Sequence, residues 1–186
     1  MPVLAMPQRS ADSPPISIRR GTPADAAALA EFAARTFQES FGVMNDPVEV
    51  AAYLRHAYGP AQQEAELRDP DHVTLLAERD GELAGYAQLR RFPTPPCVTG
   101  PHAVELRRFY VDAPFHGRGL AQQLMAEAVS TARGMGFATL WLAVWEHNPR
   151  GIAFYRNSGF TDVGWQPFLL GAEVQTDRVM ARAIQE

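Results

Sequence analysis

A glycine-bearing segment in the second half of the chain carries the clearest chemical signal. Residues 115–128 read FHGRGLAQQLMAEA, in which Gly117 and Gly119 precede a run with helical spacing. The first N–H groups of a helix have no partner within the helix, and the helix dipole is positive at that end. Glycines allow an oxygen-rich group to approach such N–H groups closely, so the segment predicts a binding site for a phosphate.

Two common nucleotide-binding loops do not fit this segment. A P-loop ends in Gly-Lys-Ser or Gly-Lys-Thr, whereas this segment continues as Gly119-Leu120-Ala121. A dinucleotide-binding fold needs three spaced glycines after the first strand of a repeated strand–helix–strand pattern, and here alanine takes the third position. The remaining hypothesis is a phosphate-bearing cofactor held by one strand–helix–strand unit.

The segments on either side predict that unit. Residues 103–112 have the alternation of a strand, and residues 138–145 (ATLWLAVW) form the apolar run of a buried parallel strand. Between them, leucines and alanines at helical spacing make one apolar face, and Gly134 and Gly136 are typical of a helix end. Strand, helix and strand in this order predict one right-handed crossover.

The first of these strands carries an irregularity. Val104 and Leu106 share one phase of the alternation, whereas Phe109 and Val111 share the other. One extra residue, as in a β-bulge, would bring both pairs to the same face of the sheet. The alternative is a strand buried on both faces, which the two arginines between the pairs disfavour.

The rest of the pattern predicts a single α/β domain with a mixed sheet. Thr22, followed by Pro23, is typical of a helix start, and Asp80-Gly81 is typical of a tight hairpin. A flexible tail is expected over residues 1–15, and one domain over residues 16–186. Further strands are expected over residues 16–20, 72–77, 82–90, 160–170 and 174–183, and further helices over 46–57, 60–67 and 148–157.

Composition excludes several classes of function. The chain has 186 residues and a net charge of -4, which argues against a nucleic-acid partner. Cys97 is the only cysteine, so no disulfide and no cysteine-based zinc site is expected, and we expect no metal. No signal peptide and no apolar run long enough for a membrane are recognised, so a cytoplasmic protein without membrane contact is expected.

Two motifs resemble the GCN5-related N-acetyltransferase (GNAT) family. The pyrophosphate loop of that family reads Gln/Arg-x-x-Gly-x-Gly/Ala, and the segment from His116 to Ala121 matches it except at the first position. The segment NPRGIAFYRNSGF, residues 148–160, is similar to the second cofactor motif of the family. The likeness extends over the chain from Ile16 onward. RTFQESFGVMND, VELRRFYVD and LWLAVWEHN are similar to the branch that includes bacterial spermidine/spermine N-acetyltransferases.

The resemblance implies a fold and an activity. The fold would be a twisted mixed sheet with splayed central strands and helices on both faces. The activity would be direct transfer of an acetyl group from acetyl-CoA, as cosubstrate, to the primary amine of a small molecule, with polyamines among the candidates. A non-catalytic acyl-CoA-binding sensor and a protein or peptide N-acetyltransferase are the alternatives. The acceptor amine stays open, as does a homodimer.

The same resemblance implies which residues form the site. Tyr155 would be the general acid for the leaving thiolate, unless it only packs its helix onto the sheet. Glu105 would accept the proton of the amine, directly or through water, unless it is a surface glutamate. Asn148 would contact the cofactor and also cap its helix. The expected cofactor-binding residues are Phe109, Tyr110, Val111, His116, Gly117, Arg118, Gly119, Leu120, Ala121, Asn148 and Tyr155.

Other reactive groups have weaker arguments. His102 and His147 flank strand ends and are lesser candidates for the base. Cys97 lies in the proline-rich loop of residues 92–102, and an acetyl-cysteine route lacks an identifiable histidine partner. Four acids fall in segments that could line the acceptor side, although charges on loops and helices are usually only solvated. These acids are Glu39, Asp46, Glu49 and Glu146.

Overall fold

One mixed sheet of seven strands runs through the protein in the order β1-β2-β3-β4-β5-β7-β6. The computed structural model describes residues 16–185, so the tail predicted over residues 1–15 lies outside the described residues. Only β4 and β5 pair in parallel, and every other neighbouring pair is antiparallel. The strands are β1 (Ser17–Arg20), β2 (His72–Arg79), β3 (Glu82–Arg90), β4 (Ala103–Val111), β5 (Thr139–Trp145), β6 (Thr161–Leu170) and β7 (Glu173–Ala183).

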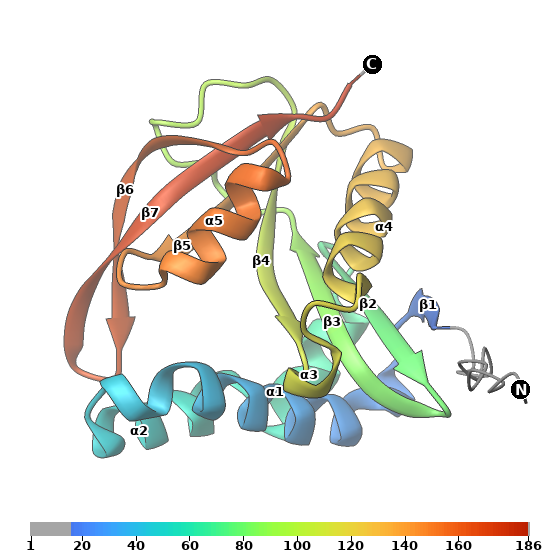
Figure 1. The fold of residues 1–186 in the computed structure, drawn as a ribbon, viewed down its shortest axis with the longest axis vertical. Coiled ribbons are helices and arrows are strands. Elements are labelled where there is room, and N and C mark those ends of the chain that lie inside the picture. Colours follow the sequence, from blue (N-terminus) through green and yellow to red (C-terminus); the bar gives the residue numbers. More distant parts are fainter. Residues whose placement is uncertain (1–15, 186) are drawn as a thin grey trace, which may run out of the picture.

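Helices cover both faces of this sheet. In Figure 1, α4 lies against the half that contains β2 to β4, α5 lies against the half that contains β5 to β7, and α1 and α2 lie together along the lower side. The predicted mixed α/β fold with helices on both faces is confirmed. The helices are α1 (Ala26–Phe41), α2 (Pro47–Ala57), α3 (Pro60–Arg68), α4 (Leu120–Gly134) and α5 (Pro149–Asn157).

The starts of the helices follow local chemistry. The side chain of Asp46 accepts hydrogen bonds from the first turn of α2, and Pro47 takes the first helical position. The helix predicted from Thr22 begins later, at Ala26, because Pro23–Asp25 form a tighter 3-10 turn. At the predicted hairpin, Asp80 and Gly81 have φ angles of 55° and 81°, as a two-residue turn requires. No described helix has the length and apolar character needed to cross a membrane.

The central pair of strands separates early. β4 and β5 are paired over three residues only, from Ala103 opposite Thr139 to Glu105 opposite Trp141. β5 is instead paired with β7 along its whole length. Beyond Glu105, β5 stays paired with β7 and β4 stays paired with β3, so the two halves of the sheet diverge. Figure 1 shows β4 running apart from β5 toward α1.

The predicted bulge in β4 is confirmed. Leu106 is opposite Leu89 and Arg108 is opposite Gln88, so Arg107 is the extra residue. The expectation that the arginines prevent burial on both faces is wrong, because Arg108 is only 5 % exposed. Its charge is tolerated because α3 supplies a buried partner.

That partner is Glu66. Its carboxylate accepts hydrogen bonds from Arg108 at 2.5 Å and from Arg107 at 2.8 Å. Gln88 donates to Glu66 at 3.0 Å, and Arg108 also donates to the carbonyl oxygen of Ala57 at 3.1 Å. The bulged residue and its neighbour are thereby tied to α3, which fixes the path of β4 where it leaves β5.

We expect Glu66→Gln to destabilise the protein by about 3–5 kcal/mol at neutral pH, because it leaves Arg108 buried without a counter-charge. Burial alone would raise the pKa of Glu66, but Arg108 and Arg107 lower it to about 2. Its folded pKa lies below its unfolded value of about 4.3, so this stabilisation is full above about pH 4.3 and is lost as the pH falls toward 2.

The measurement is urea unfolding between pH 2 and pH 7. Glu66→Gln should lose less stability between pH 4.3 and 2 than the parent protein loses. Glu64→Gln on the same helix is the matched control, since its pair with Arg68 is exposed and should contribute less than about 1 kcal/mol. Equal effects of the two variants would contradict a structural role for the buried ion pair.

Candidate active site

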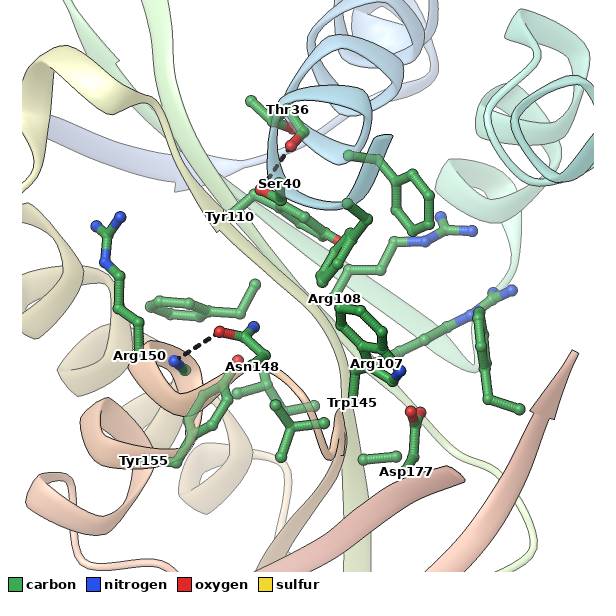
Figure 2. Close-up of a pocket in the computed structure, with 18 of the residues that line it drawn as sticks. Thr36, Ser40, Arg107, Arg108, Tyr110, Trp145, Asn148, Arg150, Tyr155 and Asp177 are labelled. Carbon is green, nitrogen blue, oxygen red and sulfur yellow. Dashed lines mark hydrogen bonds between the residues drawn. The ribbon is translucent and has the colours of Figure 1, made fainter. Parts of the chain in front are cut away.

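A cavity of about 820 Å³ occupies the space between the diverging strands. It is lined from one face of the sheet by Phe154 and Tyr155 of α5, and from the other by residues of α1 and α2. In the close-up of Figure 2, Tyr155 and Asn148 lie on one side of this space and Arg107 and Asp177 lie on the other. The cavity therefore connects two faces of the sheet that are separated elsewhere.

The backbone of β4 presents polar groups to this cavity. The N–H of Asp112, the residue after β4, donates a hydrogen bond to the carbonyl oxygen of Ala84 in β3 at 2.9 Å. Successive residues of a strand direct their hydrogen-bonding groups to opposite sides, so Tyr110 also faces β3, whereas Phe109 and Val111 face away from it. Beyond Glu105 no strand pairs with that side of β4 in the described residues. The N–H and C=O groups of Phe109 and the N–H of Val111 are available to a guest.

The loop before α4 is shaped for close approach. Gly117 and Gly119 have φ angles of 71° and 86°, which favour glycine. A Cβ atom added at Gly117 would meet nothing within 4 Å, and one at Gly119 would meet only Gln123 at 4.0 Å. Open space therefore lies beside the first N–H groups of α4, where an anion is favoured.

The other residues of the loop differ in where their side chains lie. The ring of His116 donates from Nε2 to the carbonyl oxygen of Val111 at 2.7 Å, which ties the loop to the end of β4. Arg118 is exposed, Leu120 is fully buried in the core, and Ala121 lines the cavity. The side chains of Arg118 and Leu120 do not line the cavity.

The second motif forms the start of α5. Asn148 lines the cavity and its side chain accepts a hydrogen bond from the N–H of Gly151 at 2.9 Å. The predicted N-cap is confirmed. A Cβ atom on residue 151 would lie 2.7 Å from the Asn148 amide, so only glycine allows this close cap.

Tyr155 lies about two turns after Asn148 in α5. Its ring packs edge-on against Phe109 and Phe160, with centroid distances of 6.3 and 5.9 Å. Burial raises the pKa of Tyr155 well above its usual value of about 10. The hydroxyl therefore stays protonated at physiological pH and can donate a hydrogen bond into the cavity. Tyr155 therefore packs α5 onto the sheet, as expected, and also lies beside Phe109 of β4.

Glu105 also lines the cavity, but it is paired. Its carboxylate accepts a hydrogen bond from Nε of Arg90 at 2.7 Å and forms an ion pair with Nη2 of the same residue at 2.6 Å. The side chain is 8 % exposed, so the alternative of a surface glutamate does not hold.

Tyr110 lies on the same face of the sheet as Glu105 and stacks on Tyr86 with a centroid distance of 5.5 Å. The side chain of Tyr110 thus lies on the opposite face from Phe109 and Tyr155.

The acids expected to line the acceptor side mostly have other positions. Glu39 lines the cavity, but Asp46 caps α2 and Glu49 accepts a hydrogen bond from the N–H of Ala172. The cavity acid that sequence reasoning missed is Asp177 of β7. The alternation of β7 was ambiguous, because Asp177 has the phase of the buried Val179 and Arg178 has the phase of the equally buried Met180.

The remaining reactive groups lie elsewhere. Cys97 packs against Trp141 and Val98 outside the cavity, beside Gly164. His102 and His147 do not line the cavity either. Among residues 16–185 no three histidine, cysteine, aspartate or glutamate side chains are grouped as metal ligands.

Comparisons with known sequences agree with this geometry. Residues 29–160 match the model of the acetyltransferase (GNAT) family. The chain is 33 % identical over 159 residues to an uncharacterised N-acetyltransferase of Lactobacillus delbrueckii, covering 84 % of this chain and 92 % of the relative. It is also 33 % identical over 155 residues to the N-alpha-acetyltransferase RimI of Mycobacterium tuberculosis, covering 83 % and 84 % of the two chains.

Solved structures show the same fold. The PaiA N-acetyltransferase of Thermoplasma acidophilum, solved in complex with coenzyme A, matches with a TM-score of 0.73 at 20 % identity, over 91 % of this chain and 99 % of the other. These relatives do not support the finer likeness to the spermidine/spermine branch. Together with the family match, they show that the chain belongs to the acetyltransferase (GNAT) family and is an N-acetyltransferase.

Proposed function

We propose that this protein transfers an acetyl group from acetyl-CoA directly to the primary amine of a small molecule. The observation that carries the proposal is the cavity between β4 and β5, which is open to both faces of the sheet. The glycine loop and α5 border it on one face, where the cofactor would enter. Aromatic side chains of α1 and α2 border it on the other face, where an amine would enter.

Direct transfer accounts for the groups in this cavity. The amine nitrogen bonds to the thioester carbon, the carbon–sulfur bond breaks, the amine loses one proton and the sulfur gains one. The backbone N–H of Phe109 faces the cavity and would stabilise the developing oxyanion, which is usually the largest electrostatic contribution to acyl transfer. Tyr155 would donate a hydrogen bond and then a proton to the leaving sulfur. Cys97 lies outside the cavity, which favours direct attack over an acetyl-cysteine route.

The proposal is tested by thiol release from acetyl-CoA in the presence of candidate acceptors. The panel contains monoamines, polyamines such as spermidine, aminoglycosides, amino acids and peptides. Release that requires a small amine would support the proposal. Absence of release with every small amine, with acetyl-CoA bound, would contradict the proposal.

A second candidate is acetylation of a peptide N-terminus. The observation in its favour is the 33 % identity to the RimI N-alpha-acetyltransferase. In the same assay, this function requires release with short peptides that carry a free N-terminus and none with their N-terminally blocked forms. Release with blocked peptides that contain lysine would point to the side-chain amine instead.

We expect acetyl-CoA to raise the melting temperature of the parent protein and to have no such effect on Gly119→Glu. A glutamate at residue 119 would fill the space beside the α4 N-terminus and repel phosphate. Gly136→Glu is the matched control, because Gly136 also has a φ angle of 86° with nothing nearby. Differential scanning fluorimetry makes the measurement, and a normal acetyl-CoA shift in Gly119→Glu would contradict the pyrophosphate position.

We expect Tyr155→Phe to lower kcat by about 100-fold with little change in the KM for acetyl-CoA. The substitution removes only the hydroxyl and retains the ring contacts with Phe109 and Phe160. Steady-state kinetics with one good amine make the measurement, with the acetyl-CoA melting shift as the check on folding. An unchanged kcat would leave Tyr155 with packing as its only role.

We expect Glu105→Gln to harm turnover most at low pH. Near neutral pH only about one part in a thousand of an amine with a pKa near 10 is free base. If Glu105 accepts the proton, the kcat/KM of the variant should rise about tenfold per pH unit, whereas that of the parent protein should level off.

Arg90→Met is the control for the Glu105 experiment, because it breaks the same ion pair but retains the carboxylate. Its pH profile should keep the plateau of the parent protein. Profiles of Glu105→Gln and the parent protein that differ only by a constant factor would exclude Glu105 as proton acceptor.

A further inference from the structure

Asp177 is a buried carboxylate without a partner. The residue is 7 % exposed, and among residues 16–185 no donor hydrogen-bonds to its side chain and no cation forms an ion pair with it. Burial, with the nearby charge of Glu146, raises the pKa of Asp177 to about 6. A lone charge in such a position is unfavourable unless a cation compensates it. The side chain lines the cavity, so a ligand can supply that cation.

Asp177 lies beside the gap between β4 and β5. Asp177 is opposite Trp145 in the β5–β7 ladder, and both side chains lie on the same face of the sheet. Trp145 is four residues beyond Trp141, which is opposite Glu105, and Phe109 is four residues beyond Glu105. With Arg107 as an extra residue in β4, Phe109 is three ladder positions beyond Glu105. Phe109 and Asp177 both lie beyond the point where β4 and β5 separate, on either side of the gap. Figure 2 shows the Asp177 carboxyl pointing from β7 toward Trp145.

A chain of aromatic rings borders the same part of the cavity. Trp145 meets Phe41 with a centroid distance of 6.0 Å, and Phe41 meets Phe37 at 4.9 Å. Phe37 meets Tyr53 at 4.9 Å, and Tyr53 meets Phe168 at 5.4 Å. All five rings line the cavity. Such a wall packs against an apolar carbon chain, and its ring faces attract a cation.

We propose that Asp177 and this aromatic wall form the acceptor site and bind a primary alkylammonium ion, with its charged nitrogen on the Asp177 carboxylate and its carbon chain against the rings. This inference deepens the proposed function, on which it rests, by naming the substrate class as a protonated amine with an apolar body. Asp177 is then a residue that determines specificity through charge. Neutral alcohols of the same shape gain nothing from it.

The charged groups around Asp177 set the expected pH dependence. Glu146, in the turn after β5, repels the negative form of Asp177. Arg107 on β4 lines the same cavity but is paired with Glu66, and Tyr53 on α2 is neutral because burial raises its pKa. An alkylamine is fully protonated between pH 5 and pH 8, so its binding over this range reports on the protein alone. Binding should weaken as the pH falls through the pKa of Asp177.

The experiment is calorimetric titration of hexylamine into the protein saturated with coenzyme A. For the parent protein, the Kd should rise about tenfold between pH 7.5 and pH 5, since a group with a pKa near 6 is then about nine-tenths protonated. Asp177→Asn should weaken binding about 10- to 100-fold at pH 7.5, as expected for a lost charge-assisted hydrogen bond, with little further change at pH 5. Glu146→Gln should move the midpoint of the parent profile to lower pH, because it removes the repelling charge.

Controls separate charge from shape and folding. Asp71→Asn, the same substitution at an exposed position outside the cavity, should bind hexylamine like the parent protein. 1-Hexanol should bind the parent protein and Asp177→Asn equally. Because a buried unpaired carboxylate is lost, Asp177→Asn should unfold at the same temperature as the parent protein or higher. Equal hexylamine affinities of the parent and Asp177→Asn, or the same loss toward pH 5 in both, would overturn the proposal.

Kinetics complete the test. With an amine that supports thiol release, Asp177→Asn should raise the KM for the amine far more than it lowers kcat. A fall in kcat with an unchanged KM would overturn the proposed anchor and assign Asp177 to proton transfer. Failure of every amine to release thiol from the parent protein would refute the proposed function, whereas hexylamine binding would still decide the role of Asp177.

Discussion

The divergence of β4 from β5 is the constraint on which the rest of the site depends. β5 is paired with β7 over all of its residues but with β4 over three, so it belongs to one half of the sheet beyond that point. The other half is fixed by the pairing of β4 with β3 and by the link from Arg107 and Arg108 to Glu66. Each half is held by pairing on the side away from the gap, and the facing sides of β4 and β5 stay unpaired beyond Glu105.

The gap exposes backbone groups that a sheet normally satisfies. Unpaired buried N–H and C=O groups are unfavourable, and a bound extended molecule can satisfy them as a neighbouring strand would. The backbone polar groups of Phe109 and Val111 face this space. At the end of β4, the His116 ring donates a hydrogen bond to the carbonyl oxygen of Val111. The same feature therefore separates the two faces of the sheet and provides hydrogen bonds for a molecule placed between them.

Most of the fold could be predicted from the sequence because the decisive signals are local. The slip of alternation between Leu106 and Phe109 predicted the bulge, and Asn148 predicted the cap of α5. The loop glycines predicted the positive φ positions before α4. Each of these depends on residues that are neighbours in the chain, so spacing and residue type are sufficient.

The long-range partners could not be predicted in this way. Glu66 pairs with Arg108, and Glu105 pairs with Arg90, only because the helices and strands that carry them meet in space. Asp177 was missed because its burial depends on the pairing of β7 with both β5 and β6. A charge in a strand of alternating polarity suggests solvent until the register of both neighbours is known.

Arg108 and Asp177 show two outcomes for a charge buried beside one cavity. Arg108 has a carboxylate, a carbonyl oxygen and the ring of Tyr58 around it, so its charge is compensated by the chain itself. Asp177 has none of these, and its pKa is raised as burial dictates. An uncompensated carboxylate lowers the stability of the free protein, and a cation that binds it recovers that free energy as affinity. The ion pair of Arg108 fixes the path of β4 beside the cavity, whereas the carboxylate of Asp177 is available to bind a cationic ligand.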